Sequence, residues 1–184
     1  MLNHQVYRAN EMLHSPLPHN EWTSFNCPTV VAVPITPNNR VVMVQPICAH
    51  PHGWIFPQGK IEQRNETLFQ AAVRVLQAEL GFPPDTFDQQ TARLIGEAAV
   101  KFDQGKQYYV VALPMKRRQQ PRLNGENRNC CLVGGPGQLL HNIGECSKPK
   151  LELIKHLLLT AIEQHLLYKG RWTADHVNLV IRSS

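Results

Sequence analysis

The chain has 184 residues, of which 42% are hydrophobic and 18% are charged. This composition is ordinary for a globular protein, and the length suits one domain with a sizeable core. The longest apolar run, around residues 157–159, is broken by polar and charged neighbours and is too short to span a membrane. The start of the chain lacks the basic and continuous apolar stretches of a secretory signal, so we expect a cytoplasmic protein.

The formal net charge is +5, which favours anionic ligands in general. Basic residues gather at Lys116-Arg117-Arg118 and continue at Arg122 and Arg128. This segment is either a solvated loop or a rim that steers phosphate groups toward a site. The five cysteines show no C-x-x-C spacing and are expected to be reduced thiols.

The first 26 residues show no clean period and are predicted to form an arm packed on the domain. The domain itself is assigned to residues 27–170, and residues 171–184 to a tail. Runs rich in β-branched residues at 29–36 and 40–45 flank a Pro-Asn-Asn sequence and predict two strands joined by a tight turn. A short strand is predicted at 54–56, followed by a turn at Pro57-Gln58-Gly59.

A helix is predicted to begin near residues 65–67 and to end at Gly81. Thr67 and Gln70 have the spacing of a capping box, and apolar residues then recur at four-residue intervals. Gly81 suits the left-handed conformation that ends helices. Further on, strands are predicted at 93–102 and 106–115, joined by a turn at 103–105, and at 130–133. A second helix is predicted at about 148–168, and a final strand or short helix within 172–181.

The residues from Phe56 to Phe82 read FPQGKIEQRNETLFQAAVRVLQAELGF. Glu66, Arg74, Glu79 and Gly81 have the spacing of the Nudix box, and the segment resembles that of the Nudix hydrolase superfamily. The loop after Gly59 is one residue longer than in the family pattern. Two glutamates of that pattern are replaced, by Val75 and by Ala78.

The resemblance implies an α/β (α+β) fold, in which a mixed β-sheet lies between helices in an α/β/α sandwich. It implies a hydrolase scaffold for nucleoside diphosphate-linked substrates, nucleotide polyphosphates or RNA 5′ ends. By the same resemblance, Mg²⁺ or Mn²⁺ is expected at Glu79, Glu66 and the Gly59 carbonyl. Glu79, Glu66 and Arg74 are the expected catalytic residues. The residues expected to bind substrate are His52, Lys60, Arg117 and Arg118.

The two replacements bear directly on the metal. Magnesium prefers oxygen ligands in octahedral geometry, and residues 75 and 79 lie one helical turn apart on one face. Val75 and Glu79 therefore supply half of a two-carboxylate metal site, and catalysis is predicted to be weak or lost. Carboxylates elsewhere are candidates to compensate: Glu62, Glu97, Glu126 and Glu145.

Other interpretations stay open. The chain is alternatively a non-catalytic nucleotide- or RNA-binding module derived from a Nudix hydrolase, or an interaction protein in which the box helix is only structural. Arg74 and Glu66 are alternatively a purely architectural ion pair. Cys48, His50 and His52 form a transition-metal site, a loop that contacts phosphate or base, or plain loop residues. A nucleotide is the expected ligand, RNA and a homodimer are further possible partners, and no membrane is expected.

Overall fold

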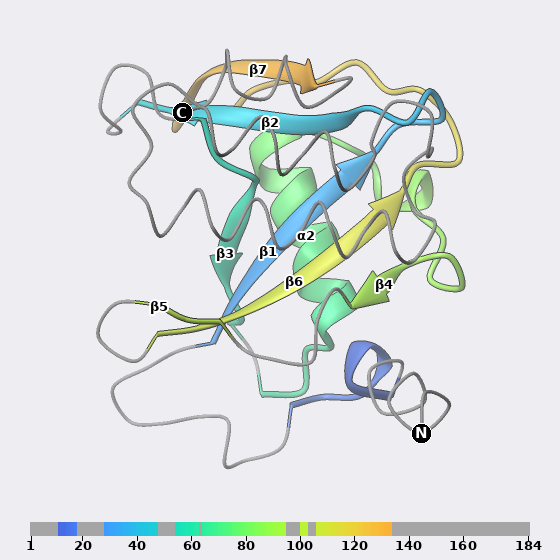
Figure 1. The fold of residues 1–184 in the computed structure, drawn as a ribbon, viewed down its shortest axis with the longest axis vertical. Helices are drawn as coiled ribbons and strands as arrows, with labels where there is room; N and C mark the ends of the chain where they lie inside the picture. The colour runs from blue at the N-terminus through green and yellow to red at the C-terminus, as the bar shows by residue number, and fades with distance from the viewer. Residues whose placement is uncertain are drawn as a thin grey trace, which may run out of the picture.

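The computed structural model describes residues 11–17, 28–47, 54–62, 64–94, 100–102 and 106–133. At the centre of the described fold, strands β1 (Thr29–Ile35) and β6 (Lys106–Pro114) pair in parallel along the whole length of β1. The sheet runs in the order β4-β6-β1-β2-β7, with β3 beside β1 and β5 beside β6 (Figure 1). The remaining strands all pair antiparallel: β2 (Val41–Pro46), β3 (Gln58–Lys60), β4 (Arg93–Leu94), β5 (Val100–Phe102) and β7 (Asn127–Val133). The sheet is therefore mixed, as predicted.

The turn between β1 and β2 forms where the Pro-Asn-Asn sequence predicted it. Asn39 adopts a positive φ of 54°, a conformation that asparagine tolerates better than most residues. Thr36 Oγ1 accepts a hydrogen bond from the Arg40 N–H at 3.1 Å and closes the turn. Six of the seven residues of β1 are buried, so the side chains on both faces of this strand are shielded from solvent.

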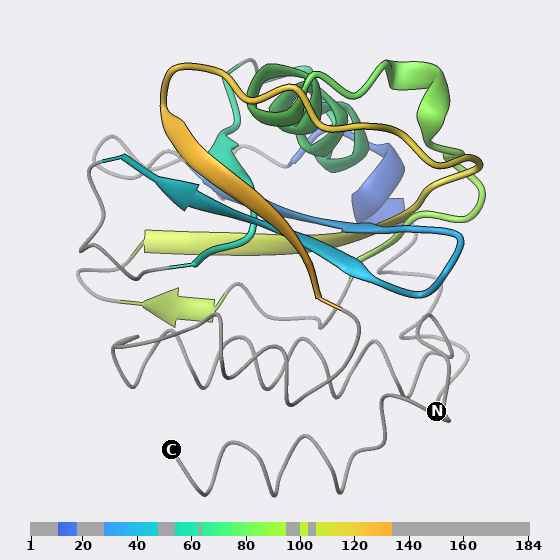
Figure 2. The ribbon, with the colours of Figure 1, turned by 90° about the horizontal axis from the view of Figure 1, so that it is seen from above.

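Helix α2 (Leu68–Leu80) covers one face of this sheet, as Figure 2 shows from above. The predicted capping box is present: the Thr67 side chain accepts from the Gln70 N–H, and the Gln70 side chain accepts from the Thr67 N–H. Gly81 ends the helix with φ 66°. Leu68, Leu76 and Leu80 are fully buried against the strands, which stabilises the fold by roughly 1.5–3 kcal/mol for each side chain.

The region before the helix differs from the prediction. Ile55 forms only an isolated bridge with Val44, and the strand lies at 58–60, where a turn was predicted. The reason is a tertiary contact. The edge of β1 pairs with Gly59 and its neighbours, and the Ala32 N–H also donates to the Pro57 carbonyl. A local turn signal at Pro-Gln-Gly was thus overridden by pairing with a distant strand.

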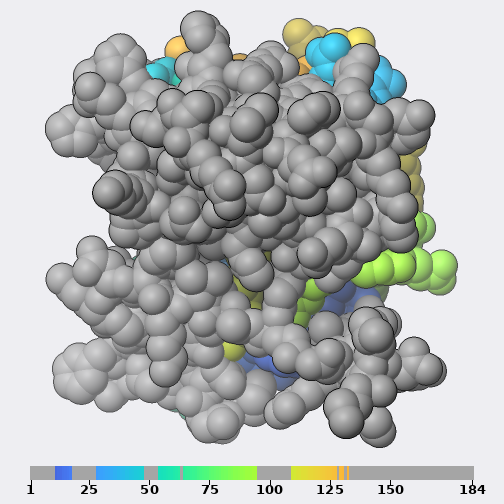
Figure 3. Space-filling view, viewed as in Figure 1, coloured from blue at the N-terminus to red at the C-terminus, as the bar shows by residue number. Residues whose placement is uncertain are grey.

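Several other boundaries change. The segment predicted as one strand at 93–102 contains β4 and β5, and residues 95–99 between them lie outside the described residues. Strand β7 begins three residues before the predicted strand at 130–133. A short 3-10 helix, η2 (Pro84–Thr86), follows α2, and this part of the chain reaches the surface on the right of Figure 3. Among the helices that the structure describes, none has the length and hydrophobicity of a membrane span.

Some predictions fall entirely outside the described residues. These are the turn at 103–105, the helix at 148–168, the tail at 172–181 and the segment from Cys48 to His52. They stay predictions, as do the domain boundaries.

Candidate active site

Three consecutive residues of β3 are contacted by three residues of helix α2. The Gln58 N–H donates to Glu79, Gly59 lies against Val75, and the Lys60 carbonyl accepts from Arg74. The first and last contacts are polar, and the middle one is apolar. The strand and the helix are thus joined along the line on which the sequence predicted the metal site.

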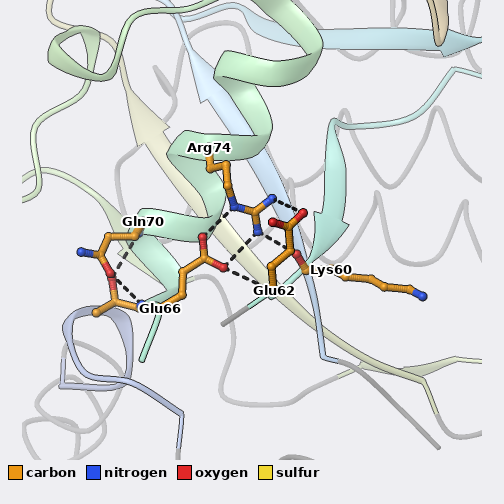
Figure 4. A network of polar contacts seen from close by, with 6 residues as sticks. Lys60, Glu62, Glu66, Gln70 and Arg74 are labelled. Atoms are coloured by element: carbon orange, nitrogen blue, oxygen red, sulfur yellow. Dashed lines mark hydrogen bonds and ion pairs between the residues drawn. The ribbon is translucent and has the colours of Figure 1, made fainter. Parts of the chain in front are cut away.

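The contact at Lys60 belongs to a dense polar cluster around Arg74. Its guanidinium forms a two-point ion pair with Glu66, with Nε–Oε1 at 2.7 Å and Nη2–Oε2 at 3.0 Å. Nη2 also donates to the Lys60 carbonyl at 2.8 Å, and Nη1 to Glu62 Oε1 at 3.1 Å. In Figure 4 the guanidinium lies between the two carboxylates, while the Lys60 side chain points away from them.

The Glu66 carboxylate is almost entirely engaged in hydrogen bonds within this cluster. Its side chain is only 11% exposed, and its Oε2 also accepts from the Glu62 N–H at 3.0 Å. The hydrogen bond from Arg74 to Glu66 raises the pKa of the arginine, so the guanidinium stays charged. The cluster fixes the loop that precedes α2 onto the end of β3, which is the architectural role that the sequence left open.

The middle contact is a close packing of glycine and valine. A Cβ built on Gly59 would lie 2.7 Å from Cγ2 of Val75, closer than real Cβ atoms approach. Val75 is 3% exposed. The residue that replaces a family glutamate is therefore buried against the glycine whose carbonyl was expected to bind metal.

Glu79 occupies the last turn of α2 and is half-buried. Oε1 accepts from the Gln58 N–H at 3.1 Å, and Oε2 from Asn127 Nδ2 at 3.2 Å. Burial raises the pKa of this carboxyl, and the nearby Glu126 adds to the increase, while the two hydrogen bonds oppose it. A carboxylate can accept about four hydrogen bonds, so the two described donors leave acceptor capacity for water or a cation.

Arg74 and Glu79 belong to separate clusters. They lie five positions apart on the helix, which corresponds to about 7.5 Å along the axis and about 140° around it. The structure brings Glu66 and Arg74 together, as predicted for the loop–helix corner, and places Glu79 at the other end of β3. Glu62, one of the candidates to compensate for the missing carboxylates, pairs with Arg74 instead and is mostly exposed.

The basic segment wraps around the end of helix α2. The Arg122 N–H donates to the Leu80 carbonyl at 2.8 Å, and the Asn124 N–H to the Glu79 carbonyl at 3.4 Å. A Cβ at Gly81 would lie 3.0 Å from Cβ of Arg122, so the glycine also makes room for this segment. An open pocket of about 440 Å³ lies there and is lined by Gly81, Pro83, Gln119, Gln120, Pro121 and Arg122.

The expected substrate-binding residues do not form one described cluster. Arg117 pairs with Asp85 at 2.8 Å beside the end of α2, and Arg118 is exposed. Lys60 is exposed on β3, and His52 lies outside the described residues.

The described donors do not fit a complete magnesium site held by the protein. No group of three or more His, Cys, Asp or Glu side chains is placed to hold a metal within the described ranges. Glu66 is engaged by Arg74, and Val75 fills the position one turn before Glu79 on the helix face. Of the two expected ligand carboxylates, Glu79 is the one that retains acceptor capacity. One carboxylate and a neighbouring carbonyl would leave most of the octahedral oxygen set of magnesium to water or to substrate phosphates.

Two residues of the site were not found from the sequence. Gln58 contributes through its backbone N–H, which any residue but proline supplies, so no side-chain pattern could identify it. Asn127 reaches Glu79 from β7, 48 residues along the chain, and an isolated asparagine carries no motif.

The profile of the NUDIX domain family matches residues 26–134, which is more than half of the chain. The chain therefore belongs to the NUDIX family. No curated protein matches the sequence significantly.

Solved structures agree on the fold. The Ap4A hydrolase of C. elegans, solved as a binary complex, aligns with a TM-score of 0.54 at 14% identity, over 75% of this chain and 97% of that chain. The NUDIX domain of Shewanella oneidensis NrtR, solved with ADP ribose, aligns with a TM-score of 0.52 at 18% identity, over 82% of this chain and 94% of that one.

A bifunctional NMN adenylyltransferase/ADP ribose pyrophosphatase of Francisella tularensis gives a TM-score of 0.55 at 19% identity. The alignment covers 89% of this chain and only 47% of that one, so it spans about half of the bifunctional protein. At these identities the similarity establishes the fold and leaves the substrate open.

Proposed function

We propose that this chain binds nucleoside diphosphate-linked compounds and hydrolyses them weakly, with Mg²⁺ or Mn²⁺ as the cofactor. The observation that carries the proposal is Glu79, a half-buried carboxylate with a raised pKa, held at the edge of β3 by two hydrogen bonds. Shifted carboxyl groups of this kind are typical of functional sites. Burial of a charge is costly unless the charge is paired or hydrogen-bonded.

The substrate class rests on the family and on the chemistry of the surface. Two of the similar structures are described with ADP ribose or as an ADP ribose pyrophosphatase, and one as an Ap4A hydrolase. Both compounds contain phosphate anhydrides flanked by sugars. The basic segment at 116–118 and Arg122 supply positive charge beside the end of α2, which suits such anions. RNA 5′ ends share this chemistry.

The weakness of the proposed catalysis follows from Val75. A divalent cation in hydrolases of this kind neutralises charge that develops on the phosphate groups. The described residues supply too few ligands for such an ion on their own, so a bound ion would also need oxygens of the substrate phosphates or of water. The ion pairs among Arg74, Glu66 and Glu62 hold the loop before α2 in place. The Glu79 carboxyl group gives or takes a proton in the site.

A non-catalytic binding module is the second candidate, and a specific observation favours it. Val75 is buried over Gly59 in an apolar contact, so the centre of the site is packed as part of the core. A domain that only binds a nucleotide has no need of a metal ligand at this position.

For either function, we propose that the protein acts in the cytoplasm. A homodimer is the proposed alternative to a monomer.

The two functions are separated by measuring binding and turnover on the same samples. Calorimetry with ADP ribose and with a dinucleoside polyphosphate, each with and without Mg²⁺, measures binding. Release of the cleaved products measures turnover in wild type and in Glu79→Gln. We expect binding in wild type and slow turnover that Glu79→Gln abolishes. Binding with no turnover selects the binding module, and the absence of both contradicts the proposed function.

A further inference from the structure

Asn127 is one of few polar side chains in the described interior. It is the first residue of β7 and is 7% exposed. Its side-chain nitrogen donates to Glu79 Oε2 at 3.2 Å and to Asn124 Oδ1 at 3.3 Å. Both hydrogens of the amide are thus used, one on the carboxylate and one on a neighbouring turn, as a buried amide requires.

The turn that precedes Asn127 holds the amide in place. Asn124 Oδ1 also accepts from the Glu126 N–H at 3.2 Å, and the Asn127 N–H bonds to the Asn124 carbonyl at 3.4 Å. The turn is tied to β2, because the Ile47 N–H donates to the Glu126 carbonyl at 2.9 Å. It is tied to the end of α2 through the bond from Asn124 to the Glu79 carbonyl described above. Asn127 therefore has little freedom to turn away.

The amide donates to the carboxylate oxygen that is not bonded to Gln58. Oε1 of Glu79 is bonded to β3 and Oε2 to β7, so the two oxygens are fixed by donors from different strands. A single donor would leave the carboxylate free to rotate about its last bond. Hydrogen bonds to a charged group contribute more than neutral ones, so both donors matter for orientation.

We propose that Asn127 is a positioning residue for Glu79, which fixes the carboxylate between β3 and β7 in one orientation. The proposal rests on the proposed function insofar as Glu79 acts on a ligand. It gives a role to the first residue of β7, which lies outside the box segment at 56–82. The residue does not touch the ligand in this assignment, and it acts only through Glu79.

The test compares Asn127→Ala and Asn127→Asp with Asn129→Ala. The control lies on the same strand, and its exposed amide bonds to Gln45 Oε1 at 3.1 Å. We expect both Asn127 variants to lower kcat by about ten- to a hundredfold with KM unchanged. A factor of this size corresponds to the free energy of one lost hydrogen bond to a charged group. Asn129→Ala should leave kcat unchanged. In a Glu79→Gln background, which is expected to lack turnover, Asn127→Ala should have no further effect on nucleotide affinity.

A second readout does not depend on turnover. The side-chain amide resonances of Asn127 should move in Glu79→Ala, while those of Asn129 stay in place. Unmoved Asn127 resonances overturn the proposal, as does a kcat that Asn127→Ala leaves unchanged. If wild type neither binds nor hydrolyses nucleotides, the proposed function fails, and the amide resonances alone then decide whether Asn127 positions Glu79.

Discussion

Val75 packs against Gly59 so closely that a Cβ added to the glycine would lie 2.7 Å from Cγ2 of the valine. This contact joins α2 to β3 in the middle of the box segment. In the family pattern, two groups expected to bind the metal lie at this contact: the glycine carbonyl and the side chain at position 75. In this chain Val75 is part of the hydrophobic core instead and packs against the glycine.

Gly59→Ala is therefore expected to destabilise the protein by about 1–3 kcal/mol, the usual cost of forcing a methyl group into a packed interior. Chemical denaturation measures the loss. Gly125→Ala is the matched control, because a Cβ there meets nothing within 4 Å. In Gly59→Ala/Val75→Ala the loss should be smaller than the sum of the single losses. Additive losses would show that the two side chains do not compete for the same space.

Restoring both glutamates is expected to raise turnover. Val75→Glu/Ala78→Glu returns the missing carboxylates, and a positioned base or metal ligand contributes about 10²–10⁴-fold to rate. We expect a gain of at least about tenfold on the nucleotide panel in the presence of Mg²⁺.

The same variant carries a stability cost that provides its control. Val75 is buried, so the new carboxylate should destabilise the metal-free protein by roughly 2 kcal/mol or more, and Mg²⁺ should recover part of this. Ala78→Glu alone lies on the exposed side of α2 and should change stability by less than about 0.5 kcal/mol. A folded double variant with no gain in rate would mean that further groups are missing.

Arg74→Lys is expected to cost about 1–3 kcal/mol of stability. Lysine cannot reproduce the two-point contact with Glu66 and leaves that nearly buried carboxylate with fewer donors. Arg117→Lys is the comparison, because both members of its ion pair with Asp85 are mostly exposed and such pairs contribute about 0–1 kcal/mol. Equal effects of the two substitutions in thermal or chemical unfolding would contradict a structural role for the Arg74 cluster.

Glu79→Gln is expected to stabilise the protein relative to wild type as the pH rises. The folded-state pKa of Glu79 is above its ordinary value of 4.5, so the folded protein holds this proton more tightly than the unfolded chain does. The stability that the protonated form contributes is fully present below pH 4.5 and is lost as the pH rises through the folded-state pKa. The neutral glutamine avoids this loss. Denaturation of both proteins from pH 4 to 8 measures the difference, with Glu11→Gln as an exposed control. A difference that shrinks toward pH 8 would contradict the assignment.

Local signals in the sequence predicted the elements that depend on local chemistry. The limits of α2 follow from Thr67, Gln70 and Gly81, because capping groups act within a few residues. The β1–β2 turn follows from Pro-Asn-Asn for the same reason. Strand β3 was missed, because its pairing with β1 depends on the edge of a strand 29 residues away, and a Pro-Gln-Gly sequence locally favours a turn.

The same limit applies to the site, where contacts set by local spacing could be predicted and long-range contacts could not. The pairing of Arg74 with Glu66 follows from the spacing of the box, and the structure contains it. The partners of Glu79 do not follow, since one is a backbone N–H and the other arrives from β7 after a long separation in sequence. The sequence also showed that residue 75 is apolar, and the structure adds that it is packed against Gly59.

The most direct measurement is Mn²⁺ binding to the nucleotide-free protein, followed by calorimetry and by the loss of the Mn²⁺ electron paramagnetic resonance signal. The described donors predict no saturable binding to wild type and saturable binding to Val75→Glu/Ala78→Glu. Saturable Mn²⁺ binding to wild type that Glu79→Gln abolishes would contradict a depleted metal site.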